Sequence, residues 1–388
     1  MSGPLIVFSG GGTGGHLFPA IAVAQALRGL LPSARFLFLG TQRAMDKRIL
    51  DQVGAEWVAQ PIPRLSYRPW HWPRIVNMLR QSRTLVRDRF QSDPPSIVVG
   101  TGGLSSIPGV REALRRGIPT ALLNPDAIPG KANRYLSKFV DRIFVQWEES
   151  TLHFARREVV QVTGCPVRPP FLKPVDRSAA YERFGLRPGL RVLLVTGASQ
   201  GARTINEAVI ANADFLKAQS DWQVLHLTGN QDWEVMVSTY KKRELTASVL
   251  PFTDHMAEAL GLADLVISRA GASTLAEITA LGKASILMPY PFHKDNHQRA
   301  NADCLVRASA ALCLTDRVDA SKNASLLGDA LATLMTNSQL RDDMSACARQ
   351  LGRPDSSTRI AHEIARQIKL QSSLAESESL QVLYTHAR

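Results

Sequence analysis

The sequence predicts an α/β protein built from two Rossmann-like, doubly wound domains that face each other across a cleft. Strand-like apolar runs alternate with helical stretches along most of the chain, which is typical of parallel βαβ units. Each half of the chain begins with the same unit, a strand followed by a glycine-rich loop and a helix: the first at residues 5–31 and the second from residue 191. The length of 388 residues exceeds one ordinary core and suits two such domains.

In the first half, short apolar runs predict the strands and amphipathic stretches predict the helices. The expected strands are residues 5–8, 35–39, 96–99, 120–123 and 142–145, and the expected helices are about 19–31 and 74–90. A proline-rich stretch at 164–174 then interrupts the alternation. Proline removes a backbone donor and fixes φ, so we interpret this stretch as an interdomain linker.

The same alternation restarts in the second half. The expected strands are 191–195, 224–227, 248–250, 265–267 and 285–288, and the expected helices begin near 204 and cover 255–262, 273–281, 295–307 and 338–350. We therefore expect an N-terminal domain at 1–163, a C-terminal domain at 164–355, a helix at 356–371 that packs back on the N-terminal domain, and a loose polar tail at 372–388.

Composition excludes several classes of protein. Hydrophobic residues make up 45% and charged residues 21%, values that exclude disordered and collagen-like chains. The cysteines, Cys165, Cys304, Cys313 and Cys347, lack metal-ligand spacing and indicate reduced, part-buried thiols of a cytoplasmic protein. No apolar run approaches the roughly 18–20 residues that span a bilayer. The N-terminus enters a strand without a signal-peptide pattern.

The positive charge is concentrated in the first domain. Residues 1–163 contain 21 Lys and Arg against 11 Asp and Glu, which accounts for +10 of the net charge of +12. Seven arginines and one acid lie between residues 64 and 89, interleaved with aromatic and aliphatic side chains. An amphipathic helix packed on its own domain explains this pattern and is slightly favoured from the segment alone. Docking on an anionic membrane is the other interpretation. Nucleic-acid binding is disfavoured, because no recognised motif accompanies the charge.

A glycine-rich loop follows the first strand. Residues 10–15 satisfy G-x-G-x-x-G, a weak signal alone. A dinucleotide site also needs an acid at the end of the second strand, and Gly40-Thr41-Gln42 has none, so hydride transfer is disfavoured. The loop ends in His16, which we interpret as a candidate acid–base group rather than a helix residue that only hydrogen-bonds locally.

Four features of the second half are expected to meet at the carboxyl ends of its strands. They are Arg168 in the linker, Ser199 before a helix, the turn and helix at 268–277, and the polar loop at 289–298. The N-terminus of a helix can bind phosphate through its free N–H groups. Glu277, expected near the first turn of its helix, would accept a ribose diol, or alternatively is a plain helix-dipole acid. The loop at 289–298 offers groups for a sugar, or is an ordinary polar loop.

Five motifs together resemble the MurG family of glycosyltransferase family 28. They are Gly11-Gly12-Thr13-Gly14-Gly15-His16 with Pro19-Ala20; Gly164 with Pro166-Val167-Arg168; Ser199-Gln200-Gly201-Ala202-Arg203 with Asn206; Arg269 with Gly271-Ala272, Thr274 and Glu277; and His293-Lys294-Asp295 with Gln298 and Asn301. The resemblance covers about residues 5–365. It implies a GT-B fold and inverting transfer of N-acetylglucosamine from UDP-N-acetylglucosamine to the C4 hydroxyl of undecaprenyl-diphospho-N-acetylmuramoyl pentapeptide (lipid I). The product, lipid II, serves peptidoglycan synthesis.

The resemblance also implies roles for single residues. Thr253 would meet the uracil through its backbone, Glu277 the ribose, and His297 and Gln298 the sugar hydroxyls. Ser199 and residues 272–274 would hold the diphosphate, and the lipid acceptor would enter beside residues 13–16. The full set expected to bind substrate is Thr13, Gly14, Gly15, Asp126, Arg168, Ser199, Thr253, Ala272, Ser273, Thr274, Leu275, Ala276, Glu277, His297 and Gln298.

The resemblance further implies a peripheral protein on the cytoplasmic face of the inner membrane. It favours membrane docking of the basic segment over a helix that only packs on its own domain. The expected membrane contacts are Trp70, Trp72, Ile75, Leu79, Arg80 and Arg83. Other cell-wall synthesis proteins are further expected partners, and nucleic acid is not.

For the chemistry, His16 is the first candidate general base and Asp126 the second. No cofactor is expected, and since no Asp-x-Asp motif appears, we expect transfer without a metal.

The sequence departs from the family at the acceptor side. Leu123-Asn124-Pro125-Asp126 stands where the family has His-Glu-Gln-Asn, and Leu104 stands where it has Tyr. These changes imply an altered acceptor, a compensated site or reduced activity. Two alternatives therefore stay open: a related GT-B enzyme acting on another lipid such as a diacylglycerol, and a nucleotide-sugar-binding subunit without catalysis.

Overall fold

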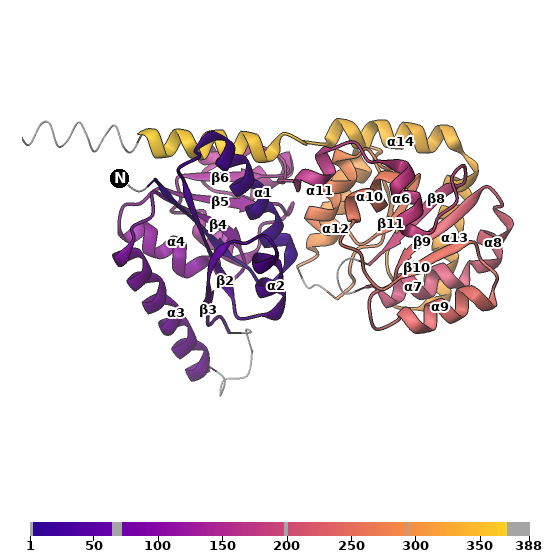
Figure 1. Cartoon of the computed structure of the whole chain (residues 1–388), viewed down its shortest axis with the longest axis horizontal. Coiled ribbons are helices and arrows are strands. Elements are labelled where there is room, and N and C mark those ends of the chain that lie inside the picture. Colours follow the sequence, from indigo (N-terminus) through magenta and orange to yellow (C-terminus); the bar gives the residue numbers. More distant parts are fainter. Residues whose placement is uncertain (1–2, 64–71, 198–200, 293–294, 371–388) are drawn as a thin grey trace, which may run out of the picture. The chain divides into compact units, whose positions relative to one another are not determined.

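The computed structural model describes residues 3–63, 72–197, 201–292 and 295–370 (Figure 1). The chain forms two compact units. Unit 1 comprises Met1–Pro125, Pro129–Pro166 and Asp355–Arg388, and unit 2 comprises Asp126–Ile128 and Val167–Pro354. Each unit contains one wholly parallel sheet in its described residues, so the predicted α/β class is confirmed.

Unit 1 has a seven-stranded sheet in the order β3-β2-β1-β4-β5-β6-β7. Its strands are β1 (Leu5–Gly10), β2 (Arg35–Thr41), β3 (Glu56–Gln60), β4 (Ile97–Gly102), β5 (Thr120–Asn124), β6 (Arg142–Val145) and β7 (Val160–Val162). Its helices are α1 (Gly14–Leu30), α2 (Ala44–Gln52), α3 (Trp72–Ser92), α4 (Ser106–Arg115), α5 (Lys131–Leu136) and a helix at 356–370. The strand order reverses beside β1 and β4, the type of position where α/β sheets bind ligands.

Helices cover both faces of this sheet. Ile6 and Phe8 of β1 pack with α1, α2 and the helix at 356–370, whereas Leu5 and Val7 pack with α3, α4 and α5. The strand is therefore apolar on both sides, as central parallel strands are. Ile360, Ile364 and Ile368 belong to the first of these cores.

Unit 2 has a six-stranded sheet in the order β10-β9-β8-β11-β12-β13. Its strands are β8 (Arg191–Thr196), β9 (Trp222–Leu227), β10 (Ala247–Leu250), β11 (Leu265–Ser268), β12 (Ser285–Leu287) and β13 (Leu312–Cys313). Its helices are α6 (Arg177–Phe184), α7 (Arg203–Ala211), α8 (Ala213–Ala218), α9 (Trp233–Lys242), α10 (Met256–Leu262), α11 (Ala272–Ala280), α12 (His297–Arg307), α13 (Ala320–Thr336) and α14 (Ser338–Leu351). Leu193 and Val195 of β8 pack with α7, α9 and α13.

Every strand expected from the sequence is present, while the short strands β3, β7 and β13 were not expected. One helix start was wrong, because α1 begins at Gly14 and continues through Pro19 instead of starting there. The chain passes from unit 1 to unit 2 after Pro166, within the expected linker, where residues Pro169–Leu172 form a 3₁₀ turn. All four cysteines are free thiols, and Cys165 and Cys304 are buried. The expected tail at 372–388 lies outside the described residues.

Candidate functional site

In unit 1 a buried carboxylate holds the glycine loop between β1 and α1. Both oxygens of Asp46 in α2 accept from the Gly12 N–H, at 2.9 and 2.8 Å, and Oδ2 also accepts from the N–H and hydroxyl of Thr41, both at 2.8 Å. Asp46 is fully buried. An added Cβ at Gly11 would lie 2.3 Å from Oδ2, so this loop needs glycine at position 11.

Asp46 occupies the neighbourhood where a dinucleotide-binding protein has its ribose acid, but its oxygens are directed at the backbone of the same unit. This agrees with the expectation that hydride transfer is disfavoured. Asp46 was not predicted, because it lies in α2, beyond the residues that end β2. The signal available was an acid five residues beyond Thr41.

His16 lies in the first turn of α1, half-buried, with its ring against the loop after β4. Its Nδ1 lies 3.2 Å from the carbonyl oxygen of Gly11. A carbonyl can only accept, so this hydrogen bond places a proton on Nδ1 and leaves the Nε2 lone pair as the basic site of the neutral ring. An added Cβ at Gly102, where φ is +108°, would lie 3.0 Å from Nε2. Gly102, which ends β4, and Gly103, which follows it, therefore make room for the imidazole.

Thr13, Gly14 and Gly15 form the N-terminus of α1. Thr13, the N-cap, is exposed, with extended φ of −151°, and its side chain makes no capping hydrogen bond in the described part of the chain. The positive end of the helix dipole is thus accessible to a negatively charged ligand.

In unit 2 the second helix N-terminus belongs to α11. Gly271 is its N-cap and has no side chain, so it cannot cap the N–H groups of residues 272–274. Leu275 and Ala276 were expected in the same set, but both side chains are buried, and the Leu275 N–H donates to the Gly271 carbonyl at 2.9 Å. The part of the turn suited to an anion is therefore 272–274.

Glu277 is the sixth residue of α11 and therefore lies near the first turn, as expected, at the start of the second. The helix dipole acts mainly within the first turn, so this position is less favourable for a plain helix-dipole acid. Its Oε1 accepts from Nη2 of Arg168 at 3.0 Å. Burial raises the pKa of Glu277 above its ordinary value, and the charge and hydrogen bond of Arg168 offset this only in part. Arg168 in turn lies over the Phe171 ring, 4.9 Å from its centroid.

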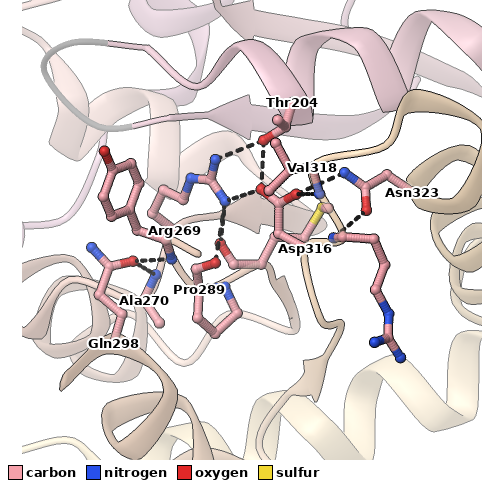
Figure 2. Close-up of polar contacts among 11 residues, drawn as sticks. Thr204, Arg269, Ala270, Pro289, Gln298, Asp316, Val318 and Asn323 are labelled. Carbon is pink, nitrogen blue, oxygen red and sulfur yellow. Dashed lines mark hydrogen bonds and ion pairs between the residues drawn. The ribbon is translucent and has the colours of Figure 1, made fainter. Parts of the chain in front are cut away.

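Gln298, in the first turn of α12, is oriented by two backbone donors (Figure 2). Its side-chain oxygen accepts from the N–H of Tyr290 at 2.8 Å and of Ala270 at 3.3 Å. The amide oxygen is thus occupied, and the NH₂ end is the end that can donate to a ligand oxygen.

His297 and Asn301 of α12 hold the segment 126–128 within unit 2. Nδ1 of His297 donates to the Ile128 carbonyl at 2.8 Å, and Nε2 lies 3.4 Å from Asp295 Oδ2. The amide of fully buried Asn301 donates to Asp126 Oδ1 at 2.9 Å and accepts from the Ala127 N–H at 2.8 Å. Asp126 is therefore fixed by an amide donor at the point where the sequence departs from the family.

Two expected site residues, Ser199 and Trp70, lie outside the described residues. Thr253 is half-buried, and its hydroxyl accepts from the His255 N–H at 3.0 Å. Among the described residues, no three His, Cys, Asp or Glu side chains gather as metal ligands.

Helix α3 divides into a packed half and an exposed half. Ser82, Val86 and Phe90 are buried, whereas Trp72 at the start of the helix is 58% exposed and Val76 is 45% exposed. Ile75 and Leu79 are half-buried, and Arg80 and Arg83 are exposed. These two arginines pair with no acid in the part of the chain that the structure describes. None of the helices formed by described residues has the length and apolarity needed to cross a membrane.

Two parallel-sheet units in one chain, each with a glycine-bearing loop and a helix N-terminus at its strand ends, define a protein of the GT-B type. The model of the glycosyltransferase family 28 N-terminal domain matches residues 6–145, and that of the family 28 C-terminal domain matches residues 192–360. The chain belongs to glycosyltransferase family 28.

Relatives of known name cover almost the whole chain. A protein of Thermodesulfovibrio yellowstonii named UDP-N-acetylglucosamine–N-acetylmuramyl-(pentapeptide) pyrophosphoryl-undecaprenol N-acetylglucosamine transferase is 34% identical over 94% of this chain and 98% of its own length. A protein of the same name from Prosthecochloris aestuarii is 37% identical over 93% and 98%. The crystal structure of Acinetobacter baumannii MurG is similar with a TM-score of 0.71 and 26% identity, over 94% of this chain and 99% of that one.

Proposed function

We propose that this chain transfers N-acetylglucosamine from UDP-N-acetylglucosamine to the C4 hydroxyl of lipid I and so makes lipid II. The observation that carries the proposal is identity of 34% and 37%, over more than nine-tenths of the chain, to proteins named for this transfer. The helix N-termini and the oriented polar side chains of the two units are consistent with it.

We assign the donor to unit 2. The N–H groups at 272–274 would face the diphosphate, Glu277 would accept the ribose hydroxyls, and the NH₂ of Gln298 would donate to a sugar hydroxyl. Arg168 supports this role of Glu277, because its positive charge favours the carboxylate that a diol can donate to. Thr253 would meet the uracil through its backbone. His297 is already bonded to Ile128, so its contribution to sugar binding would be through Nε2 or through the position of segment 126–128.

His16 would act as the general base in unit 1. As the acceptor oxygen bonds to the anomeric carbon, the bond from that carbon to the UDP oxygen breaks, and UDP leaves with the electron pair. Nε2 of His16 takes the proton of the hydroxyl, which the Gly11 carbonyl permits by holding the other proton on Nδ1. General-base assistance is worth about 10²–10⁴ in rate. His16→Ala should lower kcat by that order without weakening UDP binding, and unchanged turnover would transfer the role to Asp126 or another group.

We further propose that the leaving diphosphate is stabilised by helix N-termini without a metal. Transfer activity in excess EDTA should then equal that of the untreated enzyme. Loss of activity that added Mg²⁺ or Mn²⁺ restores would contradict this part of the proposal.

The exposed half of α3 would dock on an anionic membrane. Trp72 and the half-buried Ile75 and Leu79 supply apolar groups, and Arg80 and Arg83 supply charge for lipid headgroups. Docking of this kind would place the protein peripherally on the cytoplasmic face of the inner membrane. Trp72→Ala and Arg80→Glu should each weaken sedimentation with phosphatidylglycerol vesicles. A matched charge reversal at Arg134, an exposed arginine of α5 in the same unit, should not weaken it.

One assay separates the proposed transfer from its alternatives. Labelled UDP-N-acetylglucosamine is offered with lipid I or with diacylglycerol, and labelled lipid products are counted. Product from lipid I alone is the expected result. Product from diacylglycerol alone would show a related lipid glycosyltransferase, which the departures at Leu104 and 123–126 favour as the second candidate. Binding of UDP-N-acetylglucosamine by calorimetry without product from either lipid would show a binding subunit.

A further inference from the structure

A buried ion pair joins the ends of three neighbouring strands of unit 2. Arg269 follows β11, Pro289 follows β12 and Asp316 follows β13, and Figure 2 shows their side chains and backbone meeting at one point. Nη1 of Arg269 donates to Asp316 Oδ2 at 2.8 Å and to the carbonyls of Met288 and Pro289 at 2.9 and 3.3 Å. The Asp316 side chain is fully buried and that of Arg269 is 8% exposed.

Thr204 in the first turn of α7 completes the arrangement. Its hydroxyl accepts from Nη2 of Arg269 at 2.8 Å and donates to Asp316 Oδ2. A single hydroxyl thus bonds to both members of the ion pair, and this fixes α7 to the residue that begins the turn into α11. The network therefore joins α7, the helix after Ser199, which the resemblance assigns to the diphosphate, to the turn before α11, whose N–H groups at 272–274 we assign to the same diphosphate.

The remaining oxygen of Asp316 is also saturated. Oδ1 accepts from the N–H of Val318 at 2.9 Å and from the amide of Asn323 at 2.8 Å. Burial raises the pKa of Asp316, but the hydrogen bonds from Thr204, Arg269, Val318 and Asn323 outweigh it and hold the pKa below its ordinary value. Val318 has φ of +56°, a strained conformation for a β-branched residue, and the hydrogen bond to Asp316 helps to hold it.

The guanidinium of Arg269 is directed at protein oxygens, so the network acts on a ligand only through the position of the elements that it joins. We infer that Asp316 is a positioning residue for the donor diphosphate: through Arg269 and Thr204 it sets the N-terminus of α7 relative to the turn that begins α11. The inference rests on the proposed donor site. A diphosphate has two phosphoryl groups and can reach both helix N-termini, whereas a monophosphate has one. Loss of the network should therefore weaken the binding of UDP more than the binding of UMP.

The test is calorimetric binding of UDP and UMP to the full chain and its variants. Asp316→Asn keeps the shape of the side chain and removes its charge. It should lower the affinity for UDP about tenfold, since hydrogen bonds to charged groups are among the stronger ones. The affinity for UMP should fall by less than about threefold. Thr204→Val removes only the bridging hydroxyl and should change the ratio of the two affinities in the same direction. If Asp316→Asn fails to fold, Thr204→Val alone tests the inference. The double variant should lose less UDP affinity than the two single variants lose in sum, because both substitutions act on the same network.

Asp319→Asn is the matched control. Asp319 lies three residues further along the same loop and caps α13 by accepting from the Lys322 N–H at 2.9 Å. Because asparagine caps helices as well as aspartate does, this change should leave both the fold and the UDP-to-UMP affinity ratio unchanged. Equal losses for UDP and UMP in Asp316→Asn and Thr204→Val, or no loss, would overturn the inference. Failure of the unaltered chain to bind UDP would instead overturn the proposed donor site, and the inference with it.

Discussion

Replacement of Gly102 by alanine tests the place of His16 without altering the imidazole itself. The added Cβ would lie 3.0 Å from Nε2 and 3.1 Å from Cδ2 of His16, closer than the roughly 3.5–4.0 Å of an ordinary contact. The ring is held on its other side by the Gly11 carbonyl. Relief of the contact therefore requires a shift of the ring by about 0.5–1 Å.

The size of the effect follows from this shift. A misplacement of about 1 Å can cost about 10²-fold in rate, so Gly102→Ala should lower kcat by roughly 10- to 10²-fold. Affinity for UDP should stay the same, because the donor is assigned to unit 2. The φ of +108° at Gly102 is also unfavourable for alanine and should cost on the order of 1–3 kcal/mol of stability.

Gly117→Ala separates these two effects. Gly117 also has positive φ, +65°, but an added Cβ there meets nothing within 4 Å. It should lose stability and keep its kcat. The assay is initial-rate transfer of labelled N-acetylglucosamine to lipid I at saturating donor, normalised to folded protein, with UDP affinity by calorimetry. Wild-type kcat in Gly102→Ala, or an equal kcat loss in Gly117→Ala, would refute the argument that Gly102 and Gly103 position a catalytic imidazole.

Two further predictions concern unit 2. Glu277→Gln should lower the affinity for UDP by about tenfold and the affinity for 2′-deoxy-UDP much less, because the carboxylate is assigned to the ribose hydroxyls. Calorimetry that shows equal losses of affinity for the two ligands would contradict the assignment. His226 is buried between Tyr240 and Asn206, and burial lowers its pKa to about 3. Below about pH 6.5 the unfolded chain alone binds the proton, so stability should fall by up to about 1.4 kcal/mol per pH unit as pH decreases towards 3. Denaturant unfolding of His226→Gln should lack this dependence, and the same slope in both proteins would show that another group causes it.

The strands could be predicted because central parallel strands are apolar on both faces, and such runs are visible in a single sequence. The glycine loop and His16 were also found, since their spacing is local. The start of α1 was not found: Pro19 is a frequent first-turn residue, but here it is the sixth residue of the helix. The three residues before His16 have little helix preference of their own, and the loop fixed by Asp46 positions them.

Contacts between distant residues explain the other omissions. Asp46 bonds to Gly12, 34 positions earlier, and Asp316 bonds to Thr204, 112 positions earlier. Neither pairing leaves a periodic pattern. The segment 126–128 was expected to belong with its sequence neighbours, but its hydrogen bonds to His297 and Asn301 place it in unit 2. Asp126, one of the departures from the family, is therefore bonded to Asn301, 175 positions away.

The return of the helix at 356–370 to the core of unit 1 has a consequence during synthesis on the ribosome. Ile360, Ile364 and Ile368 complete an apolar cluster whose members outside this helix are translated more than 200 residues earlier. A nascent chain that has just exposed all seven strands of unit 1 still presents this surface to the cell. Assembly of the first unit therefore cannot finish until the helix at 356–370 has left the ribosome, and until then chaperones would find an apolar surface there to bind.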